Sequence, residues 1–170
     1  LDVRMAILDG VLAAEPQSGW QLALSLLPER GGGISHPIRL PSFRTWAQAW
    51  KPGGAWPEYN RHIQAVTERL LQHVGDDPSN RWVDLISAMP QLPRPLFDRT
   101  LEILEGVQPN EFPEESRKRI ADTLRDIVSR HREFSDAKWA LPQEAVDRLD
   151  AVHQRFLPAD LVQRHRYLFD

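Results

Sequence analysis

Five side chains between positions 44 and 59 have the chemistry of a protein-binding surface: Arg44, Trp46, Trp50, Trp56 and Tyr59. Trp46 and Trp50 are four residues apart, a spacing that would place both on one side of a short helix. Tryptophan, tyrosine and arginine are enriched among the residues that dominate binding energy at interfaces. These five residues are therefore the candidate partner-binding site. In the alternative interpretation, the segment folds back and its tryptophans close one end of a helical core.

The histidines and carboxylates do not form a metal or acid–base motif. No two histidines have the four-residue spacing that a metal site on one helix uses. His153 and His165 could meet if two C-terminal helices pack together, with Asp150 or Asp160 nearby. Most carboxylates fall on the expected polar faces of helices, so we predict solvated acids, no metal ion and no cofactor. The six histidines are His36, His62, His73, His131, His153 and His165.

The sequence also lacks the common catalytic motifs. We find no HExxH, no GxSxG, no phosphate-binding loop and no GxGxxG after a strand. Gly31, Gly32 and Gly33 could present N–H groups to an anion, but no lysine follows them and no strand precedes them, so a linker is the better interpretation. The absence of cysteine excludes a thiol nucleophile and disulfide bonds. We therefore predict that the protein is not an enzyme.

Basic residues gather toward the C-terminus, which is compatible with nucleic-acid binding. They are Arg130, His131, Arg132, Arg155, Arg164, His165 and Arg166. However, 16 basic and 19 acidic residues share the stretch from Arg61 onward, and the net charge of the chain is −3. The strong positive field that attracts phosphates is therefore absent. Ion pairs between helices and basic residues at helix C-termini explain the cluster better.

A pattern of prolines and tryptophans occurs twice, 62 residues apart. Pro16, Trp20 and Pro28 in the first copy match Pro78, Trp82 and Pro90 in the second. Apolar residues continue each stripe at helical spacing, and a second apolar stripe precedes each first proline. Each unit therefore reads as a helical hairpin with one apolar side, which stacking against a neighbour would bury. A third copy at the same offset is not found.

The rest of the chain also has helical spacing, with no sustained two-residue alternation that would predict a strand. We expect further helices near 97–104, 113–132, 142–156 and 158–168. The segment 28–57 differs, since its 30 residues include five prolines, five glycines and three tryptophans. The predicted fold class is all-α. Helical hairpins would stack as a repeat-like array, a solenoid or an irregular bundle, with one Pro/Gly/Trp-rich insertion at 28–57.

The composition fits one domain spanning 1–170, with 41% apolar and 26% charged residues. No apolar run reaches the ~20 residues that span a bilayer, and this favours a cytoplasmic location together with the lack of cysteine. Of the 21 basic residues 18 are arginine, which indicates a GC-rich, bacterial-type coding bias. The chain begins inside a helical pattern without methionine, so we expect it to be part of a longer protein.

The leading functional hypothesis is a non-catalytic helical scaffold within a larger intracellular protein. It would bind another protein or another domain of its own chain, because stacked helical hairpins offer extended surfaces. The alternative is a small-molecule-binding or enzymatic helical domain with a pocket near 44–59. Nucleic-acid binding through the C-terminal basic cluster comes third. The sequence leaves the oligomeric state and the identity of the partner open.

Overall fold

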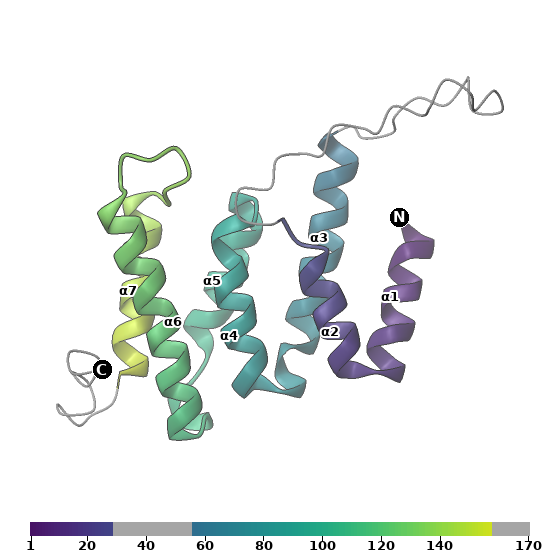
Figure 1. Cartoon of the computed structure of the whole chain (residues 1–170), viewed down its shortest axis with the longest axis horizontal. Helices are drawn as coiled ribbons and strands as arrows, with labels where there is room; N and C mark the ends of the chain where they lie inside the picture. Colours follow the sequence, from purple (N-terminus) through teal and green to yellow (C-terminus); the bar gives the residue numbers. More distant parts are fainter. Residues whose placement is uncertain (29–55, 158–170) are drawn as a thin grey trace.

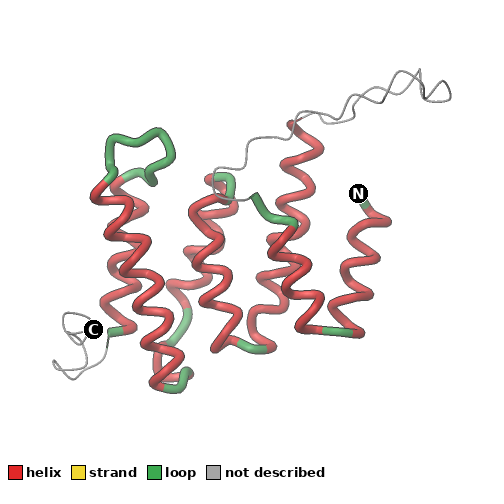
Figure 2. The backbone as a smooth tube through the Cα atoms, in the orientation of Figure 1, coloured by secondary structure: helices red, strands yellow, loops and turns green. Residues whose placement is uncertain are grey.

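The structure is a computed structural model that describes residues 1–28 and 56–157. Within these two ranges the chain forms seven α-helices and three short 3₁₀ turns, and no residue is in a strand (Figures 1 and 2). The predicted all-α fold class is therefore confirmed. Most of the segment 28–57, including Arg44, Trp46 and Trp50, lies outside the described residues, as does the helix expected at 158–168.

The helices stand side by side and follow one another along the long axis, from α1 at one end to α6 and α7 at the other (Figure 1). They are α1 (Asp2–Ala14), α2 (Pro16–Ser25), α3 (Trp56–His73), α4 (Pro78–Ala88), α5 (Arg94–Gly106), α6 (Glu114–Glu133) and α7 (Gln143–Phe156), with 3₁₀ turns η2 (Val74–Asp76), η3 (Met89–Gln91) and η4 (Pro109–Glu111). Helix α2 contacts α4, which contacts α6, whereas α3 contacts α5, which contacts α7. The helices from α2 onward therefore form two layers around a shared apolar core.

Prolines determine where several helices begin. Pro16 and Pro78 are the first residues of α2 and α4, and Pro142 immediately precedes α7. Proline fits the first turn because its missing N–H would have no partner there, and it holds the preceding residue in an extended conformation. Glu15 and Asp77 accordingly have nearly the same backbone angles, φ −138° and ψ 76° against φ −143° and ψ 71°. The two predicted hairpins, α1–α2 and α3–α4, thus enter their second helix with the same backbone conformation, although the turn η2 precedes Asp77 in the second.

The matching tryptophans of the two hairpins are both in the core, as predicted: Trp20 is fully buried and Trp82 nearly so. The hairpins differ at positions 19 and 81, which are also 62 residues apart. At Gly19 the helices α1 and α2 are so close that a Cβ would lie 2.6 Å from the Leu12 Cα. At the corresponding position α4 has the buried Arg81. Whether the hairpins are a true repeat stays a prediction.

Arg81 and its neighbours join the first hairpin to the second. The Arg81 guanidinium donates to the carbonyl oxygens of His73 and Pro16 and to Asp76 Oδ2, and it lies 4.9 Å from the centre of the Trp20 ring. One turn further along α4, Asp84 Oδ2 accepts a hydrogen bond of 2.8 Å from Trp20 Nε1. We call this group of side chains the Arg81 latch. It supplies polar contacts that fix how α2 sits against α4.

Candidate docking groove

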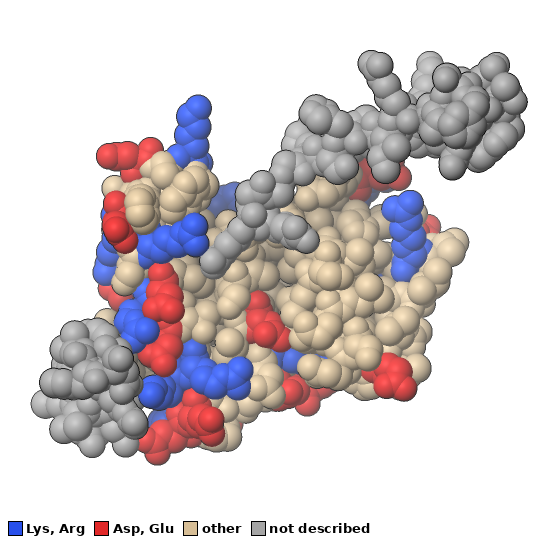
Figure 3. Space-filling view, viewed as in Figure 1, with Lys and Arg blue, Asp and Glu red and all other residues tan. Residues whose placement is uncertain are grey.

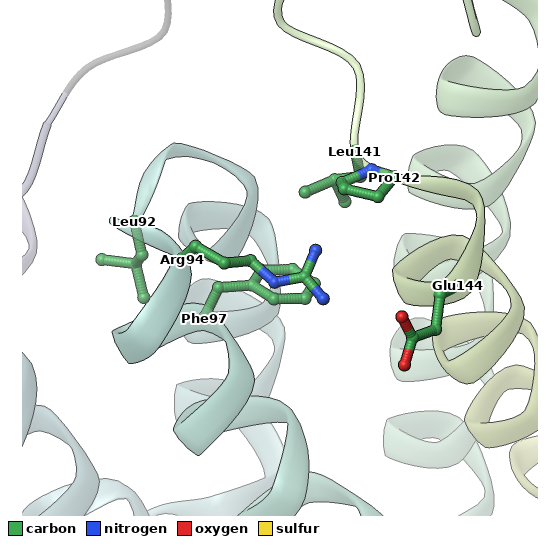
Figure 4. Close-up of a pocket in the computed structure, with 6 residues that line it drawn as sticks. All are labelled: Leu92, Arg94, Phe97, Leu141, Pro142 and Glu144. Carbon is green, nitrogen blue, oxygen red and sulfur yellow. The ribbon is translucent and has the colours of Figure 1, made fainter.

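A shallow hollow lies between the N-terminal ends of α5 and α7 (Figure 4). Helix α7 stands at the end of the array opposite α1, and α5 lies nearer the middle (Figure 1). Its volume is about 430 Å³. We call it the α5–α7 groove. The residues that line it are Leu92, Arg94, Phe97, Leu141, Pro142 and Glu144.

Extended segments ending in proline bring both walls of the groove to the same place. Leu92 and Pro93 are extended between η3 and α5, with ψ angles of 145° and 141°. Pro142 is extended in the same way before α7, with ψ 146°. The helices α5 and α7 contact each other within one layer, so their first turns lie side by side and leave the hollow between them. The groove therefore depends on two proline-terminated connections that are far apart in the sequence.

The floor of the groove is apolar, and a charge lies on each wall (Figure 4). Arg94 donates from Nε to Asp98 Oδ2 at 2.8 Å, and its guanidinium lies 5.5 Å from the centre of the Phe97 ring. One terminal nitrogen of Arg94 is shielded from solvent and has no hydrogen-bond partner among the described residues. Glu144 is exposed on the opposite wall. The groove can thus accept apolar atoms in its floor and a polar group beside Arg94.

An ion pair below the groove fixes the distance between its walls. Arg148 of α7 binds Glu105 of α5 through two parallel hydrogen bonds, each 2.8 Å long. These hydrogen bonds are the main cause of a lowered pKa at Glu105, and burial opposes them in part. The same arginine lies 3.8 Å from Asp98, the carboxylate that also holds Arg94. Bidentate ion pairs of this kind fix the relative orientation of the two side chains as well as stabilising their contact. Arg148 and Glu105 therefore hold α5 and α7 at a defined distance.

The connection between α6 and α7 carries Leu141 and Pro142 to the groove, and it is anchored on a buried histidine. The backbone N–H of Leu141 donates to His131 Nδ1 at 3.0 Å. Trp139 packs edge-on against the His131 ring at 5.4 Å and lies 5.1 Å from the Arg130 guanidinium. The Trp139 side chain is nonetheless 49% exposed, as is that of Phe134 beside it. The connection therefore presents an aromatic surface held in place by α6.

The structure describes little of the predicted partner-binding site at 44–59. Arg44, Trp46 and Trp50 lie outside the described residues. Trp56 is the first residue of α3, but its side chain is also outside the description. Tyr59, in the first turn of α3, is 40% exposed. These five residues are neither brought together nor separated by the described structure, and the site stays a prediction.

The C-terminal basic residues that are described have structural partners. Arg132 of α6 binds Asp150 of α7 at 2.9 Å. Arg155 donates to the backbone oxygens of Glu105 and Val107 at the end of α5. For the basic cluster, the sequence favoured ion pairs between helices and basic residues at helix C-termini over nucleic-acid binding. The contacts of Arg132 and Arg155 confirm this interpretation for these two side chains. Arg164, His165 and Arg166 lie outside the described residues.

The histidines in the described ranges do not gather into a metal site. Residues 1–28 and 56–157 contain no group of three histidine or carboxylate side chains that could hold a metal ion. His153 lies 3.4 Å from Asp150, as the sequence suggested, but His165 is outside the described residues. His73 pairs with Asp76 at 2.8 Å. His73 and His153 thus lie in the last turns of α3 and α7, and each ring contacts a carboxylate three residues away.

Comparison with known proteins identifies one informative similarity. Over 145 residues the chain is 25% identical to the chicken (Gallus gallus) protein named Target of Myb1 membrane trafficking protein, and the match covers 79% of this chain and 28% of that protein. The chain thus spans less than a third of the length of this relative. No family model and no solved structure matches the chain. In the described part of the chain, no helix is both long and apolar enough to cross a membrane.

Proposed function

We propose that the chain is a non-catalytic interaction domain that binds a segment of another protein in the α5–α7 groove. The observation that carries this proposal is the groove itself, an apolar floor between two proline-terminated helix starts with a charged side chain on each wall. The similarity to a membrane trafficking protein supports a function exerted through protein partners. A cytoplasmic location and membership of a larger protein belong to the same proposal.

The size and lining of the groove fit side chains of a bound protein segment. A volume of about 430 Å³ is at the lower end of the ~300–1,000 Å³ of typical ligand sites. Leu92, Phe97 and Leu141 would cover an apolar side chain, which contributes binding energy by removing its surface from water. Trp139, which lies two residues before Leu141 and is half exposed, would extend the contact beyond the groove. Aromatic side chains of this kind commonly anchor interfaces.

Arg94 would set the polar specificity of the site. Its terminal nitrogen has no hydrogen-bond partner among the described residues although solvent does not reach it. The Arg94 side chain as a whole is 40% exposed, so a carboxylate or carbonyl oxygen of the bound segment would accept a hydrogen bond from the accessible part of the guanidinium. Glu144 on the other wall would favour a donor or a positive charge at the opposite side of the segment. We therefore propose an apolar residue followed or preceded by an acidic one as the preferred ligand.

Selection of peptides on the immobilised chain tests the proposal. Peptides enriched from a random display library would be synthesised and their affinity measured by fluorescence polarisation. Arg94→Glu should weaken binding at least ~10-fold, equivalent to loss of ~1.4 kcal/mol. Arg99→Glu is the matched control, because Arg99 is exposed on the same helix but does not line the groove. Failure to enrich any peptide, or equal binding by the two variants, would contradict the proposed function.

A further inference from the structure

Ser135 lies in the connection between α6 and α7, just beyond the end of α6. The residue is exposed, and the chain forms a turn there rather than a helix. Every other serine and threonine of the described residues belongs to an α-helix, where the backbone is held in hydrogen bonds. Among the described hydroxyl groups of these two residue types, that of Ser135 is therefore the most accessible to a modifying enzyme, because such enzymes act on exposed, irregular chain.

The residues before Ser135 carry positive charge in a pattern that protein kinases recognise. Arg132 precedes Ser135 by three positions, and Arg130 precedes it by five. No other serine or threonine within residues 1–28 and 56–157 has arginine three positions before it. Kinases select their substrates in part by charge patterns, and the arginine guanidinium pairs with carboxylates in two directions at once. Accessibility and charge pattern thus select the same serine independently.

The arginines that a kinase would recognise are held only at the end of α6. Both belong to the last turn of the helix, and terminal turns open more easily than the middle of a helix. The Arg132 side chain is 46% exposed and pairs with Asp150, and exposed ion pairs contribute little to stability. Arg130 is also exposed and lies 5.1 Å from the centre of the Trp139 ring. Recognition therefore requires local opening of one helix end rather than unfolding of the domain.

A phosphate on Ser135 would change the contacts of the same arginines. It carries a charge of about −1.5 to −2 at pH 7 and three strong acceptor oxygens. Charged side chains of both signs gather at this α6–α7 end of the molecule (Figure 3). The phosphate would compete with Asp150 for Arg132, and it would draw Arg130 from the Trp139 ring. Negative charge at a helix C-terminus also destabilises the last turn.

The connection between α6 and α7 links this change to the α5–α7 groove. Trp139 is held by Arg130 and by the His131 ring, and Leu141, two residues later, lines the groove. Loss of the contact between Arg130 and Trp139 would loosen the segment that carries Leu141 into the groove. The phosphate also adds negative charge to the segment that leads into a site for an acidic residue, and this repulsion acts in the same direction.

We propose that Ser135 is the phosphate acceptor of a protein kinase that selects arginine, and that its phosphate weakens binding in the α5–α7 groove. In the transfer step, the Ser135 hydroxyl oxygen bonds to the γ-phosphorus of ATP, the bond from that phosphorus to the β–γ bridging oxygen breaks, and ADP leaves. The hydroxyl proton passes to the catalytic aspartate of the kinase. The effect on the groove rests on the proposed function, whereas the assignment of Ser135 does not.

Incubation of the chain 1–170 with an arginine-directed serine kinase and ATP tests the assignment. Mass spectrometry should locate phosphate on Ser135. Ser129 is the internal control and should stay unmodified, because it is exposed on α6 but has Asp126 three positions before it. Ser135→Ala should abolish the labelling. Arg132→Ala should lower kcat/KM for phosphorylation by roughly 10-fold or more, and circular dichroism confirms that this variant is folded.

Comparison of the phosphorylated chain with the same sample after phosphatase treatment tests the effect of the phosphate. Leu141 donates its backbone N–H to His131 Nδ1, so hydrogen exchange at this amide, followed by NMR, reports whether the connection is anchored. Exchange should be several-fold faster in the phosphorylated chain. Peptides selected on the groove should bind the phosphorylated chain several-fold more weakly. The exchange measurement needs no groove ligand.

Each half of the proposal has its own contrary result. If wild type is not labelled, if Ser129 is labelled as fast as Ser135, or if Arg132→Ala is phosphorylated as fast as wild type, the assignment is wrong. If the phosphate changes neither the Leu141 exchange rate nor the peptide affinity, it does not act on the groove. Failure to select any peptide would remove the proposed function and the effect on the groove, but not the assignment of Ser135.

Discussion

Replacing Arg81 by alanine should strongly destabilise the fold, because this residue connects the two N-terminal hairpins. Arg81 is 3% exposed and donates to the carbonyl oxygens of His73 and Pro16 as well as to Asp76. Its guanidinium also stacks on Trp20, whose own N–H is bound by Asp84. One residue thus contacts the end of α3, the start of α2 and the largest buried side chain of the first hairpin.

The contacts of Arg81 give an expected loss of about 3 kcal/mol. Two hydrogen bonds from a charged donor to the carbonyl oxygens contribute about 1.5–3 kcal/mol each, and the cation–π contact contributes about 1 kcal/mol. Against this, the buried Nε has no partner, a penalty of about 1–3 kcal/mol that the substitution removes. Asp76 adds little, since its side chain is 53% exposed and water replaces the arginine. Arg81→Met keeps the apolar stem and should lose only about half as much.

Urea unfolding followed by circular dichroism measures this loss. In a domain of this size, 3 kcal/mol corresponds to a fall of about 6–12 °C in melting temperature. Arg99→Ala is the control, because Arg99 is exposed on α5 and its removal should change stability by no more than about 0.5 kcal/mol. If Arg81→Ala and Arg99→Ala agree within about 1 kcal/mol, the Arg81 latch does not hold the hairpins together.

Three further predictions concern packing and pH. Gly19→Ala should lower stability by about 1–3 kcal/mol, because its Cβ would lie 2.6 Å from the Leu12 Cα. Gly10→Ala, in open space, should raise stability by up to about 1 kcal/mol, and thermal unfolding of the two variants compares them directly. Burial is the main cause of a lowered pKa at His62. The unfolded chain therefore binds this proton first, and stability should decline as pH falls below about 6.5; urea unfolding across this range should show no such decline in His62→Gln. Arg148 lowers the pKa of Glu105, so the stability from this pair is present above about pH 4.3 and lost as pH falls further. Glu105→Gln should flatten this acid loss more than the exposed Glu102→Gln does.

The helices were predictable because both the residue at which a helix begins and the spacing of its apolar residues are set by nearby sequence. Proline restricts its own residue and the one before it, so Pro16, Pro78 and Pro142 mark helix starts without reference to the rest of the fold. The spacing of apolar residues likewise identifies the face that each helix buries, as Trp20 and Trp82 show. The pairing of α5 with α7 was not predictable in this way, since it depends on how α6 returns the chain across the array.

The groove could not be found from the sequence for the same reason. Arg94 and Glu144 are ordinary charged residues at the starts of two helices, separated by 50 positions. They line the same groove only because the two helices lie in one layer with their first turns at the same end. The available signal was weak but real: proline beside a leucine precedes both helices, at Leu92–Pro93 and Leu141–Pro142. The aromatic residues at 44–59 were a stronger compositional signal, but they lie mostly outside the described structure.

The difference between Gly19 and Arg81 follows from what each residue contacts. The second hairpin has a neighbour on its N-terminal side, and Arg81 uses it by donating to Pro16 of α2 and stacking on Trp20. At position 19 an arginine would not fit, because a Cβ alone would lie 2.6 Å from the Leu12 Cα. Gly19 instead lets α2 pack directly on the α1 backbone. The first hairpin is therefore held by close packing of its two helices, whereas the second is joined to the first through the polar contacts of Arg81.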